Sequence, residues 1–213
     1  GRFAENPHFA YLTVDKADLV TVADKNILRR INCETSQKKW NTKTKFDDIF
    51  SVHSCSQDWI ALGEHASDCG RACLYSFSTG IQSDLVIEHE DRVRGIAFSR
   101  DNRLIATTSE SGTLKIHELE TGEQKWETVS DSHGAFGVDF HPDGDRIAVG
   151  CMRGVKIWSI SQRKLLAAWN AHSWFVRTVQ FSSDGKQLLS GSADKTTALW
   201  NLSNLDGVLR YRP

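Results

Sequence analysis

Residues 171–201 read AHSWFVRTVQFSSDGKQLLSGSADKTTALWN. Apolar side chains recur within 176–181 and 187–192, and a short polar turn follows each run. In the first of these turns, Asp184-Gly185 supplies the positive φ that a tight hairpin needs. A third apolar run ends at Trp200. The stretch therefore predicts consecutive short strands that fold back on one another.

The same pattern recurs along the chain. Phe98, Phe140 and Phe181 each end a short apolar run, with separations of 42 residues (98 to 140) and 41 residues (140 to 181). The endings of the expected third strands keep the same period, at Tyr75, His117, Trp158 and Trp200. Residues 34–42 (ETSQKKWNT) also resemble 120–128 (ETGEQKWET) at an offset of 86 residues. The repeat therefore reaches the N-terminal part of the chain.

Four short strands per unit of about 40–45 residues are typical of a β-propeller blade, a small sheet that buries its faces only against neighbouring blades. No long segment keeps the apolar spacing of a helix. We expect an all-β fold of about five four-stranded antiparallel blades, in one repeat region covering 1–213. The repeats are expected near 7–44, 45–88, 89–132, 133–171 and 172–213.

The unit at 171–201 resembles a WD40 repeat, and the resemblance is clear over 89–213 and weaker over 1–88. In that family, a buried hydrogen-bonded network joins a histidine, a serine or threonine, an aspartate and a tryptophan. The resemblance assigns these roles to His172, Ser190 or Ser192, Asp194 and Trp200. A hydrolytic triad is the alternative interpretation, but it requires an exposed nucleophile and an oxyanion hole.

The remaining units diverge from the family pattern, because the tryptophan position holds His117, Tyr75 and Ile31. WD40 propellers usually close with seven blades, whereas five open blades would expose two apolar faces and two unpaired edges. The sequence also begins without methionine and ends inside an expected fourth strand. We therefore expect part of a seven-bladed ring, completed by further sequence or by a second protein. Overlooked degenerate strands and a closed five-bladed ring are the alternatives.

Charge and cysteine usage narrow the functional classes. Lys plus Arg (26) nearly balance Asp plus Glu (27), so no global field favours nucleic acid or an acidic membrane. No apolar run approaches the roughly 20 residues of a membrane span. The five cysteines are odd in number and unevenly spaced, which indicates free thiols in a reducing compartment. We expect an intracellular protein, cytoplasmic or nuclear, without a membrane partner.

The second unit contains several residues of the types that bind zinc. They lack the two tight pairs of a zinc site, so we predict no metal and no other cofactor. The residues concerned are His53, Cys55, His65, Cys69 and Cys73. Glycine-rich phosphate loops, paired-carboxylate motifs and nucleophile elbows are likewise absent from the sequence. The sequence therefore predicts a protein that is not an enzyme and has no small-molecule substrate.

In a propeller, the loops that enter the first strand and those that join the second to the third gather on one face around the central channel. Aromatic side chains and arginines on this face are the expected partner-binding residues. They are Arg92, Arg94, Phe136, Trp174, Phe175 and Arg177. Trp174 is the leading candidate, and packing between blades is its alternative role. The arginines suit an acidic peptide or a phosphate, or are simply solvated.

The sequence therefore favours a scaffold or adaptor that docks proteins or peptides within a complex. An RNA-linked assembly factor, in ribosome biogenesis or RNA processing, is the alternative binding function. Nucleic acid is weakly supported by a segment that interleaves basic and aromatic side chains. The segment comprises Lys38, Lys39, Trp40, Lys43, Lys45 and Phe46. An enzyme built on a propeller is the third option.

Overall fold

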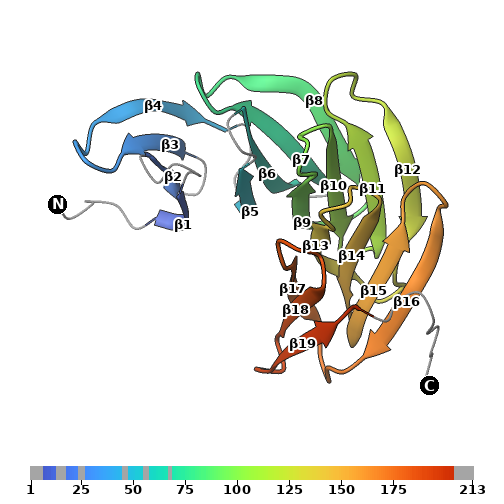
Figure 1. Cartoon of the computed structure of the whole chain (residues 1–213). Coiled ribbons are helices and arrows are strands. Elements are labelled where there is room, and N and C mark those ends of the chain that lie inside the picture. The colour runs from blue at the N-terminus through green and yellow to red at the C-terminus, as the bar shows by residue number, and fades with distance from the viewer. Residues whose placement is uncertain are drawn as a thin grey trace. The chain divides into compact units, whose positions relative to one another are not determined.

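The computed structural model describes residues 7–12, 18–23, 27–44, 48–54, 58–66 and 69–203. Within these ranges the regular structure consists of nineteen strands in five antiparallel sheets, without a helix (Figure 1). The predicted all-β class is confirmed. In the part of the chain that is described, no helix is long and apolar enough to cross a membrane.

The chain divides into two compact units, Gly1–Val93 and Arg94–Pro213. The first unit holds two sheets, which we call blades 1 and 2. Blade 1 comprises β1 (Pro7–Leu12), β2 (Asp18–Ala23), β3 (Ile27–Asn32) and β4 (Lys38–Lys43). Blade 2 comprises β5 (Asp48–Ser54), β6 (Trp59–Ala66), β7 (Cys69–Ser76) and β8 (Gln82–His89). In both, spatial order follows chain order, so each strand pairs with the next through a hairpin.

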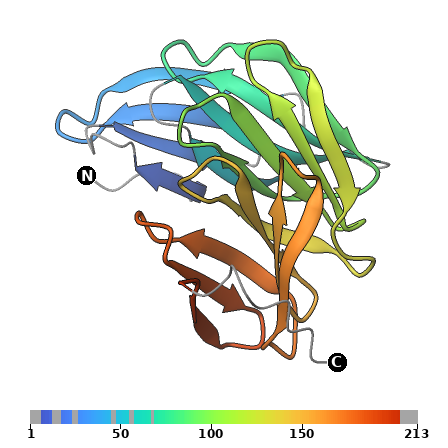
Figure 2. The same ribbon diagram turned by 45° about the vertical axis from the view of Figure 1, so that its right-hand side comes forward.

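The second unit holds blades 3 to 5, each a twisted ribbon of short strands (Figure 2). Blade 3 comprises β9 (Val93–Phe98), β10 (Leu104–Ser109), β11 (Thr113–Glu118) and β12 (Gln124–Val129). Blade 4 comprises β13 (Ala135–Phe140), β14 (Arg146–Cys151), β15 (Gly154–Ser159) and β16 (Lys164–Asn170). Blade 5 comprises β17 (Val176–Phe181), β18 (Gln187–Ser192) and β19 (Thr197–Asn201), and an expected fourth strand would fall among residues that are not described.

The first strands of blades 3, 4 and 5 approach one another closely. A β-carbon at Gly95 of β9 would lie 2.1 Å from the carbonyl oxygen of Phe136 on β13. A β-carbon at Gly137 of β13 would lie 2.7 Å from the carbonyl oxygen of Arg177 on β17. Only glycine fits such a backbone approach. These two glycines therefore set the positions of Phe136 and Arg177.

Tryptophans join the outer parts of the same blades. Trp126 of β12 lies edge-on to Trp158 of β15, with ring centroids 5.7 Å apart. Trp169 of β16 stacks on Trp200 of β19, with centroids 5.1 Å apart. The indole N–H of Trp158 also donates to the hydroxyl of Ser130, at 3.2 Å. Aromatic pairs add about 0.5–1.5 kcal/mol beyond their buried area, so each outer-strand tryptophan fastens its blade to the third strand of the next.

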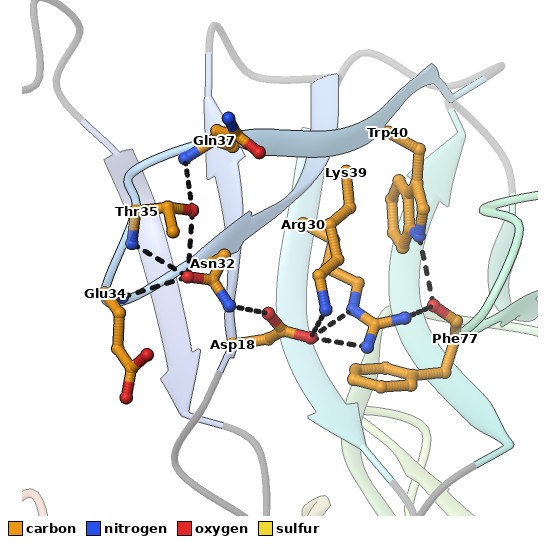
Figure 3. A network of polar contacts seen from close by, with 9 residues as sticks. All are labelled: Asp18, Arg30, Asn32, Glu34, Thr35, Gln37, Lys39, Trp40 and Phe77. Atoms are coloured by element: carbon orange, nitrogen blue, oxygen red, sulfur yellow. Dashed lines mark hydrogen bonds and ion pairs between the residues drawn. The ribbon is translucent and has the colours of Figure 1, made fainter.

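Blades 1 and 2 are joined at the turn that follows β7 (Figure 3). The indole N–H of Trp40, on β4, donates to the carbonyl of Phe77 at 3.0 Å. Arg30 of β3 donates to the same carbonyl at 2.9 Å, and its guanidinium lies 3.8 Å from the centre of the Phe77 ring. An outer-strand tryptophan thus contacts the next blade here too, but an arginine shares the contact.

A buried carboxylate holds this arginine in place. Asp18 of β2 is 1% exposed and accepts hydrogen bonds from Arg30 and, at 2.8 Å, from the ammonium of Lys39. Burial pushes the pKa of Asp18 upward, but the hydrogen bonds and charges of Lys39 and Arg30 outweigh it and lower the pKa. The carboxylate therefore stays ionised and satisfied, and the two cations together leave this network positively charged.

A second carboxylate lies between blades 4 and 5. Asp139 of β13 accepts a hydrogen bond from the backbone N–H of Phe181, on β17, at 2.7 Å. Burial raises the pKa of Asp139 from 3.8 to about 6, and hydrogen bonds from the N–H groups of Phe181 and Phe140 only partly offset it. The charged form of Asp139 therefore lowers the stability of the fold.

Removing the Asp18 carboxylate should destabilise the protein more than removing its exposed partner. Asp18→Ala leaves the Arg30 guanidinium, 14% exposed, without its counter-ion, and breaking a buried pair costs about 3–5 kcal/mol. Lys39 is 43% exposed, so Lys39→Ala should cost less than about 1 kcal/mol. Urea unfolding followed by circular dichroism measures both. Equal losses for the two variants would contradict this account of the network.

The raised pKa of Asp139 predicts a pH-dependent stability. The stabilising effect of the protonated carboxyl is complete below pH 3.8 and is lost as the pH rises through about 6, which amounts to about 3 kcal/mol. Asp139→Asn keeps an acceptor for Phe181 and removes the charge, so it should stabilise the protein at pH 7 and abolish this decline. Unfolding measured between about pH 4 and 7 tests it. Asp184→Asn, at an exposed turn, is the control and should leave the decline in place.

Candidate functional site

Four residues that the sequence nominated for partner binding lie together in the second unit. The rings of Phe136 and Phe175 stack with centroids 5.0 Å apart. Trp174 lies edge-on to Phe175, with centroids 5.7 Å apart, and the Arg177 guanidinium lies 4.9 Å from the centre of the Phe175 ring. We call Phe136, Trp174, Phe175 and Arg177 the aromatic cluster. It brings blades 4 and 5 together at one surface.

The backbone beneath the aromatic cluster is held by hydrogen bonds. Trp174 and Phe175 lie in the loop between β16 and β17. The Ser192 hydroxyl lies 3.2 Å from the carbonyl oxygen of Trp174 and 3.1 Å from that of Phe175. The N–H of Ala193 donates to the Phe175 carbonyl at 3.0 Å. Trp174 nevertheless remains 53% exposed, so the loop presents a large aromatic ring to solvent from a fixed backbone.

The two other nominated arginines have different surroundings. Arg94, on β9, donates through Nε to the Glu110 carboxylate at 2.7 Å, and both side chains are half-buried. Arg94 was expected to bind an acidic peptide or a phosphate, but the Glu110 carboxylate already neutralises its charge. Arg92 belongs to the first compact unit, where its backbone N–H donates to the carboxylate of Asp91 at 2.7 Å. The cationic group of the aromatic cluster is therefore Arg177.

The residues nominated for a structural network surround a buried histidine. His172 Nε2 lies 2.9 Å from the Ser190 hydroxyl, which accepts a hydrogen bond from the indole N–H of Trp200 at 3.0 Å. The Ser190 proton is therefore available to Nε2, which leaves Nδ1 of His172 as the donor. Nδ1 lies 2.9 Å from the Thr196 hydroxyl and 3.3 Å from the carboxylate of Asp194. Each polar side chain of this network around His172 has a hydrogen-bond partner.

The Asp194 carboxylate orders the turn after β18. Hydrogen bonds from the Thr196 hydroxyl and from the backbone N–H groups of Ser173 and Thr196 lower the pKa of Asp194 well below its usual range. Thr196 was missed at the sequence level, although its position two residues after an aspartate is that of an Asx turn. Ser192, one of two serines considered for the network, supports the loop of the aromatic cluster instead, and its Oγ accepts from the N–H of Asp194 at 3.1 Å.

The set of zinc-ligand residue types is only partly described. Cys69 and Cys73 lie on β7, whereas the side chains of His53, Cys55 and His65 lie outside the described residues. Among the side chains that are described, no group of three or more His, Cys, Asp or Glu lies close enough to hold a metal ion.

The basic and aromatic segment at the end of blade 1 has structural roles. Lys39 pairs with Asp18, and the indole of Trp40 contacts the neighbouring blade at Phe77. Lys45 and Phe46 lie outside the described residues. Lys39 and Trp40 therefore contribute to packing, whereas Lys38 and Lys43 are exposed on β4.

Comparisons with known proteins agree with the blades. The family model "WD domain, G-beta repeat" matches residues 81–118 and 163–201. The chain is 40% identical over 96 residues to protein HIRA of Dictyostelium discoideum, a match that covers 37% of this chain and 9% of that protein. It is 24% identical over 176 residues to pre-mRNA-processing factor 19 homolog 2 of Arabidopsis thaliana, covering 80% of this chain and 32% of the relative.

A third relative is the U3 small nucleolar RNA-associated protein 12 of Saccharomyces cerevisiae. It is 34% identical over 111 residues, which are 51% of this chain and 12% of the yeast protein. The matched part of the chain thus spans a third or less of the length of these three relatives. The likeness therefore covers only part of each relative.

Loss of the Ser190 hydroxyl should destabilise blade 5. Ser190→Ala leaves the Trp200 N–H and His172 Nε2 without their shared partner, and a buried unsatisfied polar group costs about 1–3 kcal/mol. We expect the free energy of unfolding to fall by about 2 kcal/mol in chemical denaturation. Ser183→Ala, in an exposed turn of the same blade, should change it by less than about 0.5 kcal/mol. A Ser190→Ala protein as stable as the control would show that the network adds nothing to stability.

Proposed function

Because this chain belongs to the WD40-repeat family, we propose that it is a non-enzymatic scaffold or adaptor that docks a protein partner on the aromatic cluster. The observation that carries the proposal is Trp174, a 53% exposed indole supported edge-on by Phe175. Large aromatic side chains and arginines contribute most of the binding energy of protein interfaces. Here both kinds occur on one surface.

The cluster combines apolar area with a directional polar group. Arg177 is exposed, and the contact of its guanidinium with the face of Phe175 leaves the N–H edges available to a carboxylate or a carbonyl of the partner. The ring stack of Phe136 and Phe175 holds the neighbouring apolar surface in a single arrangement. A partner with an apolar side chain and an acceptor a few ångströms away would satisfy both groups.

A hydrolytic reading of His172, Ser190 and Asp194 has little support. The Ser190 side chain is fully buried, and its oxygen already accepts from Trp200 and faces His172. A nucleophile must be reachable by substrate and must lie beside an oxyanion hole. We infer that these residues hold blade 5 together and that the chain acts by binding.

A role within an RNA-containing assembly is the second candidate. It is favoured by the names of two relatives, a pre-mRNA-processing factor and a protein associated with the U3 small nucleolar RNA. In this version the chain would dock a protein of such an assembly, inside the cell, in the nucleus or the cytoplasm. Direct RNA binding has less support, because two members of the basic and aromatic segment of blade 1, Lys39 and Trp40, contact Asp18 and Phe77 instead.

Truncation of Trp174 should weaken partner binding without unfolding the protein. In affinity purification with quantitative mass spectrometry, we expect Trp174→Ala to recover specific partners in amounts at least about tenfold lower than the parent chain does. A loss of this size is typical of a hot-spot residue. Its thermal unfolding midpoint should match that of the parent chain. Val129→Ala, 61% exposed on β12, is the matched apolar control and should retain the partners.

Two results would count against the docking proposal. Partner recovery that is unchanged in Trp174→Ala would exclude the aromatic cluster as the docking surface. If partner recovery depends on Trp174 but is lost after ribonuclease treatment, RNA bridges the chain and the partner, and direct docking of a protein is excluded.

A further inference from the structure

A hollow of about 770 Å³ lies in the second unit, beside the hairpin between β14 and β15. Its lining residues differ from those of the aromatic cluster. They come from the loop after β12, from the hairpin tip, from the end of β16 and from β19. Those used below are Asp131, Arg153, Lys156, Trp169 and Trp200.

The positive charge of the hollow comes from the hairpin. Arg153 is exposed at the hairpin tip, and its carbonyl accepts a hydrogen bond from the backbone N–H of His172 at 3.0 Å. Lys156 Nζ lies 3.1 Å from the Asp131 carboxylate and 2.5 Å from the carbonyl oxygen of Ser130. Lys156 therefore neutralises Asp131, and Arg153 leaves the lining with a net positive charge on an anchored turn.

Another part of the lining is aromatic. Trp169 and Trp200 stack at 5.1 Å between ring centroids, and both side chains remain half-buried. Two stacked indoles form a rigid apolar surface, which suits an aliphatic or aromatic side chain. Among the described residues, the hollow thus offers one guanidinium without a carboxylate partner and one apolar surface.

We propose that this hollow is a second docking site, which takes an extended peptide segment of a partner protein bearing a carboxylate side chain next to an apolar one. The carboxylate pairs with Arg153, whose planar guanidinium binds carboxylates through two parallel hydrogen bonds. The apolar side chain packs on Trp169 and Trp200. A single-stranded RNA fits less well, because it needs several cations along its backbone and the hollow has one net charge.

The inference rests on the proposed function only in taking the partner to be a protein. A random peptide library displayed on phage and selected against the whole chain tests it without knowledge of that partner. We expect the enriched peptides to place an aspartate or glutamate beside an apolar residue. Fluorescence polarisation of a labelled enriched peptide then gives its affinity for the chain and its variants.

Charge reversal at the hairpin tip should abolish this affinity selectively. Arg153→Glu is expected to weaken binding at least about tenfold, and Arg153→Lys, which keeps the charge but loses the paired hydrogen bonds, to weaken it less. Arg100→Glu, at an exposed turn outside the hollow, is the matched control and should bind like the parent chain. Because the carboxylate contact lies at the surface, raising the salt from about 50 to about 300 mM should weaken binding.

Three outcomes would overturn the second site. They are the enrichment of peptides without acidic residues, the enrichment of none, and equal affinity of Arg153→Glu and the parent chain. A fluorescent oligouridylate that binds the parent chain but not Arg153→Glu would also overturn it, because the hollow would then serve RNA. Trp174→Ala separates the two proposals. If it removes peptide binding while Arg153→Glu does not, the peptides occupy the aromatic cluster and only the inference about the hollow fails.

Discussion

A blade of short strands has two faces to cover and can cover them only against its neighbours, so the contact between adjacent blades governs the rest of this structure. In the second unit the contact has an inner and an outer part. Inside, Gly95 and Gly137 let the first strands pass with no side chain between them. Outside, Trp126 and Trp169 reach across to the next blade. Both parts must fit at once.

The two units meet this requirement with different chemistry. Blades 4 and 5 are joined by the stacked indoles of Trp169 and Trp200. Blades 1 and 2 instead rely on Asp18, Arg30 and a shared carbonyl at Phe77. A charged network of this kind depends on every member being present, whereas stacked indoles tolerate small shifts. The geometry of the blade is retained while the residues that secure it change.

The strands and turns could be predicted from the sequence because they depend on neighbouring residues. Positive φ was expected at the Asp184-Gly185 turn, and Gly185 has a φ of 71°. The site is harder to predict, because its contacts join residues far apart. The Ser192 hydroxyl that bonds the Phe175 carbonyl lies 17 residues away, and Phe136, whose ring stacks on that of Phe175, comes from the neighbouring blade. The repeat period predicts which residues lie in corresponding loops of the blades. It does not predict which of their side chains are in contact.

The hydrogen bonds under Trp174 and Phe175 also bear on the kinetics of recognition. A loop whose carbonyls are already bonded to Ser192 and Ala193 has little freedom left to lose when a partner arrives. The entropic cost of ordering then falls mainly on the partner, and encounter requires no rearrangement of this surface. Changes in the cluster should therefore alter the lifetime of a complex far more than the rate at which it forms.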